Sequence, residues 1–340
     1  MRVAELDYDL PPELIAQEPA RPRDSSRLLV LHRETGEIEH RMFRELVQYL
    51  KGEDVVVLND TKVIRARLKG RRHPGGGKAE VLLLSRQEDG AWEALVTPGR
   101  RLGPGREIVF GKGELRAEVL ERTPSGGRRL CFSGAGDLEA ALERLGEVPA
   151  PPYVHRPIQQ ESDYQTVYAR IPGASAAPTA GLHFTPEIVE QVRARVHAVT
   201  YVTLHIGLGT FRPIHAENVE EHDMHAESYA VPRPTAQIVS EALDQGRRVV
   251  AVGTSTARAL EAAAEGGKIR PGAAETDLFI RPGYEFRVLG ALLTNFHMPR
   301  STLLLLICAF ADREQVLRAY RQAVEMNYRF LSFGDAMLLV

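Results

Sequence analysis

The first sixty residues alternate between the hydrophobic patterns of strands and of helices. Residues 27–31 (RLLVL) and 54–58 (DVVVL) are short, nearly continuous apolar runs, which are typical of buried strands. Between them, a turn at Thr35 and Gly36 precedes the segment 37–43, and residues 43–51 (FRELVQYLK) have helical spacing. This opening predicts strands and helices that alternate along the chain, as in an α/β fold.

A different pattern begins near residue 65. Up to about residue 131, short apolar runs are separated by turns rich in glycine and proline, such as 73–78 (HPGGGK) and 97–106 (TPGRRLGPGR). This pattern predicts a small antiparallel barrel or sandwich. A short helix expected over 137–146 and a linker at 148–153 (VPAPPY) end this section.

Strand and helix patterns alternate again beyond the linker. Examples are the strand pattern of 198–206 (AVTYVTLHI), the helical pattern of 235–246 (TAQIVSEALDQG) and the buried strand 247–252 (RRVVAV). Such alternation predicts a mainly parallel or mixed sheet covered by helices. We therefore expect an α/β protein with a discontinuous α/β main domain, residues 1–64 plus 152–340, and an inserted small antiparallel β-barrel-like domain at 65–151.

Composition restricts the class of protein further. The 340 residues are 44% hydrophobic and 26% charged, which are values of a globular chain and exclude a disordered or fibrous one. The two cysteines, Cys131 and Cys308, form no CxxC motif and no zinc-binding spacing, as expected in a reducing compartment. The N-terminus lacks a signal-peptide pattern, and the longest apolar run, 303–310, is far shorter than the roughly 20 residues that span a bilayer. We expect a cytoplasmic protein without a membrane segment.

The charge of the chain is unevenly distributed. The formal net charge is only -2, but residues 65–130 contain 15 Arg and Lys against 8 Asp and Glu, a local charge of +7. A local basic patch attracts a polyanion even when the whole protein is nearly neutral. A solvated hairpin rim would also explain these loops, but the local charge favours contacts with RNA phosphates. The candidate residues are Arg71, Arg72, Lys78, Arg100, Arg101 and Arg106.

Polar residues follow two of the buried strands, at the position where α/β folds bind their ligands. Asn59, Asp60 and Lys62 follow strand 54–58, although an ordinary Asn-Asp turn with a surface lysine explains them as well. After strand 247–252 the chain turns into a helix, and free N–H groups at a helix N-terminus suit a carboxylate or phosphate. Ordinary capping explains this turn almost equally well. Its residues are Gly253, Thr254, Ser255 and Thr256.

Two histidines precede local breaks in the pattern. Thr179, Gly181 and His183 come just before a helix whose expected N-cap is Thr185, so His183 is either a satisfied loop histidine or a ligand contact. His205 ends a strand pattern before the glycine-rich segment 207–209. A neutral imidazole exchanges protons near pH 7, and glycine permits a close approach to a ligand. A lone histidine on a strand is more often structural, so both interpretations remain open.

The segment 221–229 (EHDMHAESY) contains His222, His225 and Glu227 within six residues. These side chains are candidates for metal ligation or for acid–base chemistry. The HExxH motif and cysteine ligands are absent, so we prefer acid–base or substrate-binding roles. The alternative function is a metal-dependent hydrolase that uses His205, His222, His225 and Glu227.

Two further segments end in polar residues. The patterns at 276–280 (TDLFI) and 291–296 (ALLTNF) predict strands, and we expect their ends to be neighbours that form one pocket. The polar residues concerned are Asp277, Arg281, Tyr284, Asn295 and His297.

Taken in order, the motifs resemble the S-adenosylmethionine:tRNA ribosyltransferase-isomerase family of queuosine biosynthesis over nearly the whole chain. They include VVVLNDTKVI at 55–64, AAPTAGLHFT at 176–185, LHIGLGTFRP at 204–213, VGTSTARALE at 252–261 and LTNFHMPRSTLLLL at 293–306. Other matching segments are 17–31, 164–169, 224–229, 276–284 and 328–338. The insert resembles the family mainly in size and position. Departures are Arg65, Gly290, Met298 and Arg300.

The resemblance implies transfer and isomerisation of the ribosyl part of S-adenosylmethionine onto 7-aminomethyl-7-deazaguanine at the tRNA wobble position, which yields epoxyqueuosine, adenine and methionine. It implies a monomer and no metal or cofactor beyond S-adenosylmethionine as co-substrate. Such chemistry needs proton-transfer groups, for which His205 and His297 are the first candidates, followed by His183, His225 and Glu227. Thr210 and Arg212 of the 204–213 motif join the substrate-binding candidates. A non-catalytic RNA-binding module is a further alternative.

Overall fold

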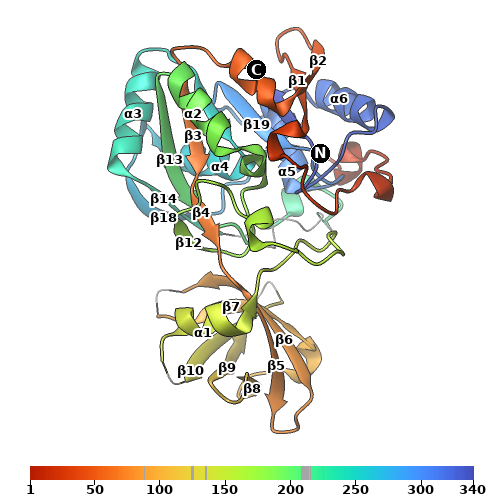
Figure 1. Cartoon of the computed structure of the whole chain (residues 1–340), viewed down its shortest axis with the longest axis vertical. Coiled ribbons are helices and arrows are strands. Elements are labelled where there is room, and N and C mark those ends of the chain that lie inside the picture. The colour runs from red at the N-terminus through yellow and green to blue at the C-terminus, as the bar shows by residue number, and fades with distance from the viewer. Residues whose placement is uncertain (88, 124–125, 135, 208–213, 215, 225) are drawn as a thin grey trace.

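The computed structural model describes every residue except 88, 124–125, 135, 208–213, 215 and 225. Two β-sheets dominate it: a large mixed sheet with helices, and below it in Figure 1 a small antiparallel sheet that closes on itself. The expected fold class, α/β with an inserted antiparallel β-barrel, is confirmed.

The large sheet has nine strands, and its centre is parallel. The order across the sheet is β18 (Gly272–Thr276), β14 (Glu227–Val231), β13 (Ala198–Leu204), β3 (Val55–Asn59), β15 (Val249–Val252), β19 (Ala291–Asn295), β20 (Ala336–Leu339), β1 (Arg27–Leu31) and β2 (Ile38–Met42). Strands β13, β3, β15 and β19 pair in parallel, so their carboxyl ends lie at one edge. The other pairings are antiparallel except for that of β1 with β20.

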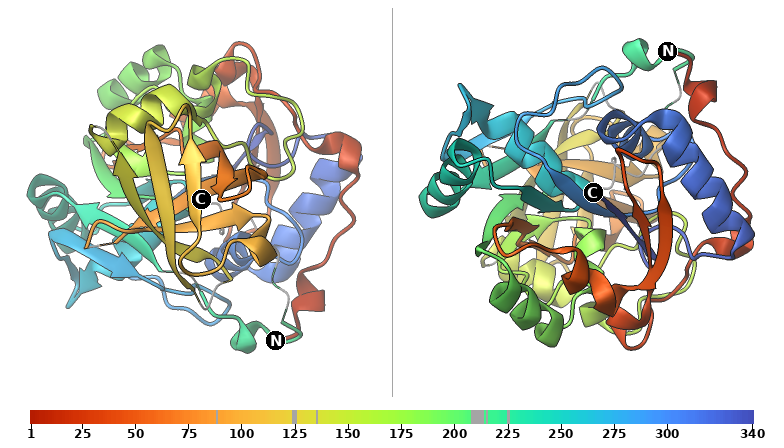
Figure 2. Two further views of the ribbon diagram at one scale, coloured as in Figure 1. Left: turned by 90° about the horizontal axis from the view of Figure 1, so that it is seen from below. Right: turned by 90° about the horizontal axis from the view of Figure 1, so that it is seen from above.

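Helices cover both faces of this sheet, as the two views of Figure 2 show. In β15, Val249 and Ala251 pack into one hydrophobic core while Val250 and Val252 pack into the other. Both faces are therefore buried, which explains the continuous apolar runs in the sequence. One core contains α3 (Arg233–Asp244), α4 (Thr254–Ala263), α5 (Thr302–Phe310) and α6 (Arg313–Glu325); the other contains α2 (Pro186–Arg195) and the 3₁₀ helix η4 (Phe43–Tyr49).

The small sheet is a six-stranded barrel that β5 and β8 close. Its strands in order are β5 (Arg67–His73), β6 (Lys78–Arg86), β7 (Trp92–Thr97), β10 (Arg128–Gly134), β9 (Leu115–Arg122) and β8 (Glu107–Phe110). A Cβ atom added at Gly70 would lie 2.6 Å from the Phe110 ring and 2.7 Å from the Val109 carbonyl oxygen. Glycine at this position therefore permits the close approach of β5 and β8.

Short elements connect the two sheets. Helix α1 (Leu138–Leu145) leads into β11 (Gly146–Glu147), which pairs with the start of β5, and β4 (Thr61–Val63) pairs in parallel with β12 (Ile171–Ala174). The chain thus enters and leaves the barrel through adjacent segments. Other short elements are β16 (Ala264–Glu265), β17 (Lys268–Ile269), η1 (Val3–Leu6), η2 (Pro12–Leu14), η3 (Arg23–Ser25), η5 (Gly99–Arg101), η6 (Glu161–Tyr164), η7 (Thr179–His183) and η9 (Val219–Glu221). In the described part of the chain, no helix is long and apolar enough to cross a membrane.

One topological expectation was wrong. The segment 276–280 is not a strand beyond Thr276, and β18, which ends there, is separated from β19 by β14, β13, β3 and β15. The apolar side chains of 278–280 pack on the core without a strand partner. The Arg258 side chain bonds the carbonyl oxygens of Thr276 and Leu278 at 3.2 Å each, so these backbone acceptors are satisfied outside a sheet.

Candidate active site

The four parallel strands at the centre of the large sheet deliver polar residues to one edge. Asn59 ends β3, His205 follows β13, Gly253 follows β15, and Asn295 ends β19 with His297 two residues beyond. Because these strands are adjacent, the segments that follow them lie together, although Asn59 and His205, for example, are 146 residues apart in the sequence. Ligand sites of α/β proteins form at this edge.

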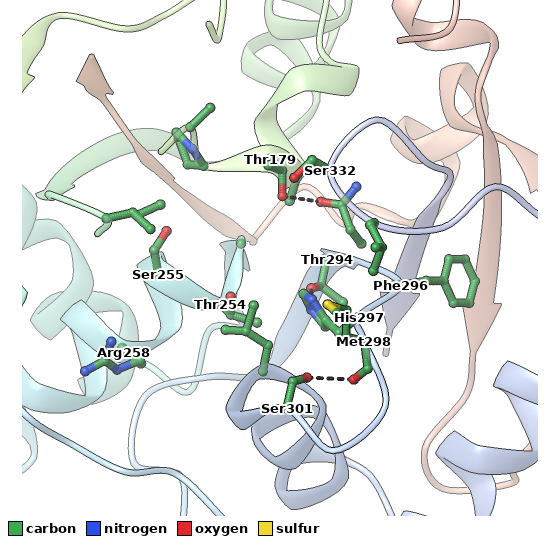
Figure 3. A pocket seen from close by; sticks show the side chains of 18 of the residues that line it. Thr179, Thr254, Ser255, Arg258, Thr294, Phe296, His297, Met298, Ser301 and Ser332 are labelled. Atoms are coloured by element: carbon green, nitrogen blue, oxygen red, sulfur yellow. Dashed lines mark hydrogen bonds between the residues drawn. The ribbon is translucent and has the colours of Figure 1, made fainter. Parts of the chain in front are cut away.

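The first cavity opens between these strand ends and has a volume of about 720 Å³ including its mouth. Figure 3 shows its walls, which come from η7, the start of α4 and the end of β19. Polar and charged lining residues are Thr179, Glu227, Thr254, Ser255, Arg258, Thr294, Asn295, His297, Ser301 and Ser332. Apolar walls with a few converging polar groups are typical of small-molecule sites.

The turn from β15 into α4 forms one wall of the first cavity. Gly253 has φ +93°, a backbone conformation that favours glycine, and its N–H group bonds the Leu293 carbonyl oxygen at 2.8 Å. Thr254 and Ser255 line the cavity, whereas the Thr256 hydroxyl donates back to the Val252 carbonyl oxygen at 2.6 Å. The helix N-terminus thus faces the cavity and suits an anionic group, while Thr256 is structural.

His297 lies in the wall of the first cavity and is buried. Its Nε2 atom is 2.8 Å from the Thr294 hydroxyl, and its main chain bonds the hydroxyl groups of Tyr8 and Tyr320. Burial lowers the pKa of His297 to about 3. The imidazole is therefore neutral near pH 7 and is a weak base.

A buried ion pair lines the first cavity. Glu227, at the start of β14, pairs with Arg258 of α4, and both side chains are more than nine-tenths buried. The Glu227 carboxylate also accepts the backbone N–H of Gly207 at 3.2 Å. The sequence pattern did not single out Arg258; the available signal was a charged residue within the small and apolar residues that follow the Gly-Thr-Ser turn.

A second, larger cavity lies between the barrel and the large sheet, with a volume of about 1870 Å³ including open solvent. The barrel contributes residues of β6, β7 and α1, and the large sheet contributes the segments around Gly173, His205 and Glu227. Glu227 lines both cavities. Glu227 is therefore a wall residue that the two cavities share.

His205 is half-buried in the wall of the second cavity. Its Nδ1 atom is 2.7 Å from the Thr61 hydroxyl, and a Cβ atom added at Gly173 would lie 2.7–2.9 Å from three atoms of its ring. Burial lowers the pKa of His205, although the Asp60 charge acts in the opposite direction. The ring is therefore oriented by Thr61, covered by glycine backbone and neutral near pH 7.

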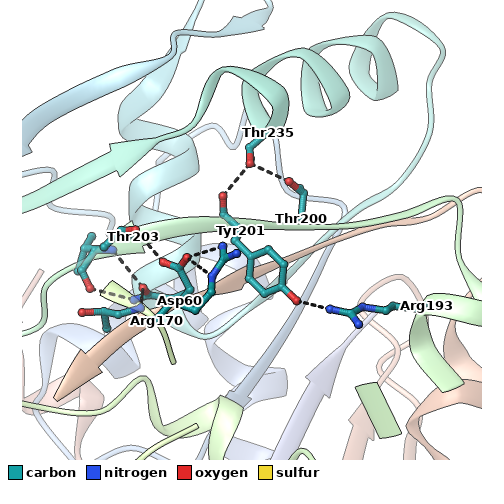
Figure 4. A network of polar contacts seen from close by, with 10 residues as sticks. Asp60, Arg170, Arg193, Thr200, Tyr201, Thr203 and Thr235 are labelled. Carbon is teal, nitrogen blue, oxygen red and sulfur yellow. Dashed lines mark hydrogen bonds and ion pairs between the residues drawn. The ribbon is translucent and has the colours of Figure 1, made fainter. Parts of the chain in front are cut away.

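Asn59 and Asp60 support this strand end from within the protein. The Asn59 side chain is fully buried and bonds the main chain of Leu204 in both directions, at 3.0 and 3.1 Å. Asp60 accepts bonds from Arg170 at 2.7 and 3.1 Å and from Thr203 at 2.7 Å, and Arg170 stacks on Tyr201, as Figure 4 shows. Both side chains have structural partners, whereas Lys62 is exposed and lines the second cavity.

His183 is buried behind the wall of the first cavity, between Ser26 and Asn295. Burial lowers its pKa to about 3. Gly181 is buried beside it, and a Cβ atom there would lie 2.0 Å from the Tyr168 hydroxyl, so its role is close packing. Thr179 does line the first cavity.

The three candidates beyond β18 lie apart from both cavities. Asp277 is exposed, Arg281 pairs with Glu220 at 3.3 Å, and the Tyr284 hydroxyl bonds Glu261 at 3.1 Å. Glu261, on α4, also accepts the backbone N–H groups of residues 287–289. None of the three belongs to the described residues that line either cavity.

The six basic candidates gather at one end of the barrel. This end combines the β5–β6 hairpin, the end of β7 and the start of β8, because β6 pairs with β7 and β5 with β8 there. The hairpin is the lowest point of Figure 1. Within the described residues none of the six forms an ion pair, and the second cavity is at the opposite end of the barrel. The six basic candidates at this end of the barrel are Arg71, Arg72, Lys78, Arg100, Arg101 and Arg106.

Thr210, Arg212 and His225 lie outside the described residues. His222 is described, and its ring contacts Phe279 with centroids 5.5 Å apart. Among the residues that can be placed, no three His, Cys, Asp or Glu side chains come together as metal ligands would. The metal-dependent hydrolase is therefore not favoured.

Fold and site define an α/β enzyme class in which an inserted barrel faces the ligand-binding edge of the main sheet. The family model described as "Queuosine biosynthesis protein" matches residues 3–339, and the chain belongs to this family. S-adenosylmethionine:tRNA ribosyltransferase-isomerases of Moorella thermoacetica and Caldanaerobacter subterraneus are 56% and 50% identical to it, with both chains fully covered. The crystal structure of S-adenosylmethionine tRNA ribosyltransferase from Thermotoga maritima is 42% identical, covers 99% of this chain and 100% of its own, and superposes with a TM-score of 0.57. The family predicted from the motifs is confirmed.

Proposed function

We propose that this enzyme transfers and isomerises the ribosyl moiety of S-adenosylmethionine onto 7-aminomethyl-7-deazaguanine at the wobble position of tRNA, giving epoxyqueuosine-tRNA, adenine and methionine. The observation that carries the proposal is that two cavities share Glu227 in their walls. The first is lined by the polar side chains of Thr179, Asn295 and His297 and by a helix N-terminus, which suit a nucleoside donor, and the larger is open enough for a nucleotide of a macromolecule. The names of the relatives support the same reaction.

In this proposal S-adenosylmethionine, the ribosyl donor, binds in the first cavity. Thr254 and Ser255, at the N-terminus of α4, are suited to the methionyl carboxylate. Thr179, Asn295 and His297 line the same space and are suited to the polar groups of the ribose or adenine. The target nucleotide approaches through the second cavity, past Lys62 and His205.

His205 is the residue best suited to be the base. The sulfonium acidifies the adjacent 5′ carbon of the donor, and a base must take that proton before adenine leaves protonated and methionine departs. His205 is neutral, only half-buried and faces the larger cavity, while the next residue, Ile206, lines the first cavity. We therefore place the 5′ carbon of the donor at this side of the first cavity, within reach of His205. His183 and His297, with pKa values of about 3, are weaker bases and better suited to hydrogen bonding. Glu227 is held by Arg258 and is suited to orient the ammonium or hydroxyl groups of a substrate.

The basic end of the barrel is proposed to bind tRNA phosphates away from the reacting nucleotide. Along β6, Lys78 and Arg86 are eight residues apart, or about 25 Å at the usual rise of a strand. A tRNA seated in the second cavity reaches both ends of the barrel if its stem follows this strand. We include in this proposal the domain limits 65–151 for the RNA-binding insert and 1–64 plus 152–340 for the catalytic part.

Salt dependence tests the RNA-binding end. If the six basic residues neutralise about four phosphates, the logarithm of the affinity should fall with the logarithm of the salt concentration at a slope of about -3.6. The Arg71→Gln/Arg72→Gln protein should show a slope that is less steep by about 1 to 2, because up to two contacts are lost. Arg116→Gln is the matched control, since Arg116 already pairs with Glu107 at 3.4 Å. An unchanged slope in the double variant would place the RNA phosphates elsewhere.

Release of adenine tests the reaction itself. Purified protein, S-adenosylmethionine and tRNA bearing 7-aminomethyl-7-deazaguanine should yield adenine and methionine in equal amounts, with no metal added. We propose that the active form is a monomeric, cytoplasmic protein that needs no cofactor beyond the donor, so treatment with chelators should leave the rate unchanged. Adenine release that did not depend on tRNA, or none at all, would contradict the proposed function.

A further inference from the structure

Four side chains form a row of hydrogen bonds behind the wall of the first cavity. The Ser26 hydroxyl is 2.8 Å from Nδ1 of His183, and Nε2 of His183 is 3.0 Å from the amide nitrogen of Asn295. The amide oxygen of Asn295 is 2.9 Å from the Thr179 hydroxyl. Only Asn295 and Thr179 line the cavity, so the row connects buried protein to the ligand space.

With the Asn295 amide oriented as in the structure, nitrogen toward His183 and oxygen toward Thr179, the chemistry of these groups sets the direction of each hydrogen bond. An amide nitrogen can only donate, so Nε2 of His183 accepts and carries no proton. The neutral ring then has its proton on Nδ1 and donates it to Ser26. At the other end, the amide oxygen of Asn295 can only accept, so the Thr179 hydroxyl donates to it. The hydroxyl proton of Thr179 is therefore used in a hydrogen bond within the protein and is not available to a ligand.

His183 is held firmly in this arrangement. Its side chain is 4% exposed, and its ring stacks on Phe43 with centroids 5.0 Å apart and an interplanar angle of 26°. Phe43 is in turn fully buried against Phe184. The ring cannot rotate without disturbing this aromatic packing, so the orientation of the Asn295 amide is fixed by the core.

We propose that His183 is a positioning residue that acts through Asn295 to make the Thr179 hydroxyl an obligate hydrogen-bond acceptor in the first cavity. The group it receives is a donor N–H or O–H of the bound nucleoside or of its amino-acid part. A hydrogen-bond donor of the ligand therefore fits beside the Thr179 hydroxyl. A group that can only accept hydrogen bonds, such as a carboxylate, is excluded from this position. The inference rests on the proposed function for the identity of the ligand, but its hydrogen-bond directions do not.

Calorimetric binding of S-adenosylmethionine to the full-length protein tests the acceptor. The valine of Thr179→Val has nearly the same shape as threonine but no oxygen. It therefore leaves a hydrogen-bond donor of the ligand without an acceptor in the cavity. Its dissociation constant should rise about 10- to 100-fold. Thr179→Ser retains the acceptor and should bind within about threefold of the wild-type protein. Equal binding by Thr179→Val and the wild-type protein would overturn the proposal.

The remote role of His183 is tested by coupling to Thr179. His183→Leu should weaken binding about 10-fold because the Asn295 amide is released, and His183→Gln, which can present an amide oxygen as acceptor, should restore part of the loss. In the Thr179→Val background, His183→Leu should cause no further weakening, since both changes remove the same interaction. His40→Gln is the matched control: His40 also bonds two side chains, Tyr328 and Gln322, but lies outside the described lining of the first cavity. Additive effects of His183→Leu and Thr179→Val would assign His183 a merely structural role.

Nuclear magnetic resonance of the unliganded wild-type protein tests the row even if the His183 variants do not fold. The two-bond nitrogen–proton correlations of His183, assigned through bonds to its backbone, should show a protonated Nδ1 and an unprotonated Nε2. A His183 ring with its proton on Nε2 would overturn the inference but would not contradict the proposed function. Absence of S-adenosylmethionine binding by the wild-type protein, with the expected tautomer present, would instead contradict the proposed function.

Discussion

Replacement of His205 by glutamine should lower kcat by about 10²- to 10⁴-fold while the dissociation constant of S-adenosylmethionine changes little. The imidazole lines the second cavity and lies outside the described lining of the first cavity, and a general base usually contributes a rate factor of this size. The pKa of His205 is lowered from 6.5, so the imidazole is already neutral near pH 7 and the wild-type rate should not change with pH there. The rate should fall only at a pH below this lowered pKa, where the base is protonated. This acid limb should be lost in the variant.

Gly173→Ala provides a companion to that experiment. The added methyl group would lie within 3 Å of the His205 ring and must displace it from Thr61, so kcat should fall although the imidazole is still present. Gly207→Ala is the matched control, because a Cβ atom at Gly207 meets nothing within 4 Å among the described atoms. If His205→Gln and Gly173→Ala both turned over at the wild-type rate, another group would have to be the base.

Loss of the Arg258 guanidinium should destabilise the large sheet by about 3–5 kcal/mol, because Arg258→Met removes a positive charge that pairs with the buried Glu227 carboxylate. The carbonyl oxygens of Thr276, at the end of β18, and of Leu278, just beyond it, would lose their donor as well. Urea unfolding followed by circular dichroism at the helix band should show the lower free energy of unfolding, since all the described α-helices except α1 pack on the large sheet.

Two controls accompany the Arg258 measurement. In Arg258→Met/Glu227→Leu the buried charge is gone, and most of the lost stability should return. Trp92, the single tryptophan, lies in the barrel, so its fluorescence follows that part of the molecule separately. A double variant no more stable than the single one would mean that packing or the carbonyl contacts of Arg258, and not the buried charge, account for the loss.

The pattern of the sequence was sufficient for the architecture and for one half of the site. Continuous apolar runs such as 54–58 identify strands buried on both faces, and the polar residues after them come together because parallel neighbours share an edge. His205, Asn295 and His297 were placed at cavities in this way. Local alternation of elements, together with the usual packing of parallel strands, carries this information.

Strand order and burial could not be obtained in the same way. Nothing local to 276–280 or 291–296 shows that four other strands separate β18 from β19, because sheet order depends on contacts between distant segments. The sequence likewise does not distinguish His183, buried behind the wall, from His205, which faces a cavity. Arg258 and Gly173 were missed because their roles, a charge partner and a cover for a ring, exist only in the folded chain.

The first cavity is built without any contribution from the barrel, since its described walls come from residues 153 to 332. The barrel in turn is attached through two hydrogen-bonded segments that leave and rejoin the main sheet side by side. Under the proposed roles, a change in the length or charge of the insert would alter the contacts with RNA without altering the walls of the first cavity.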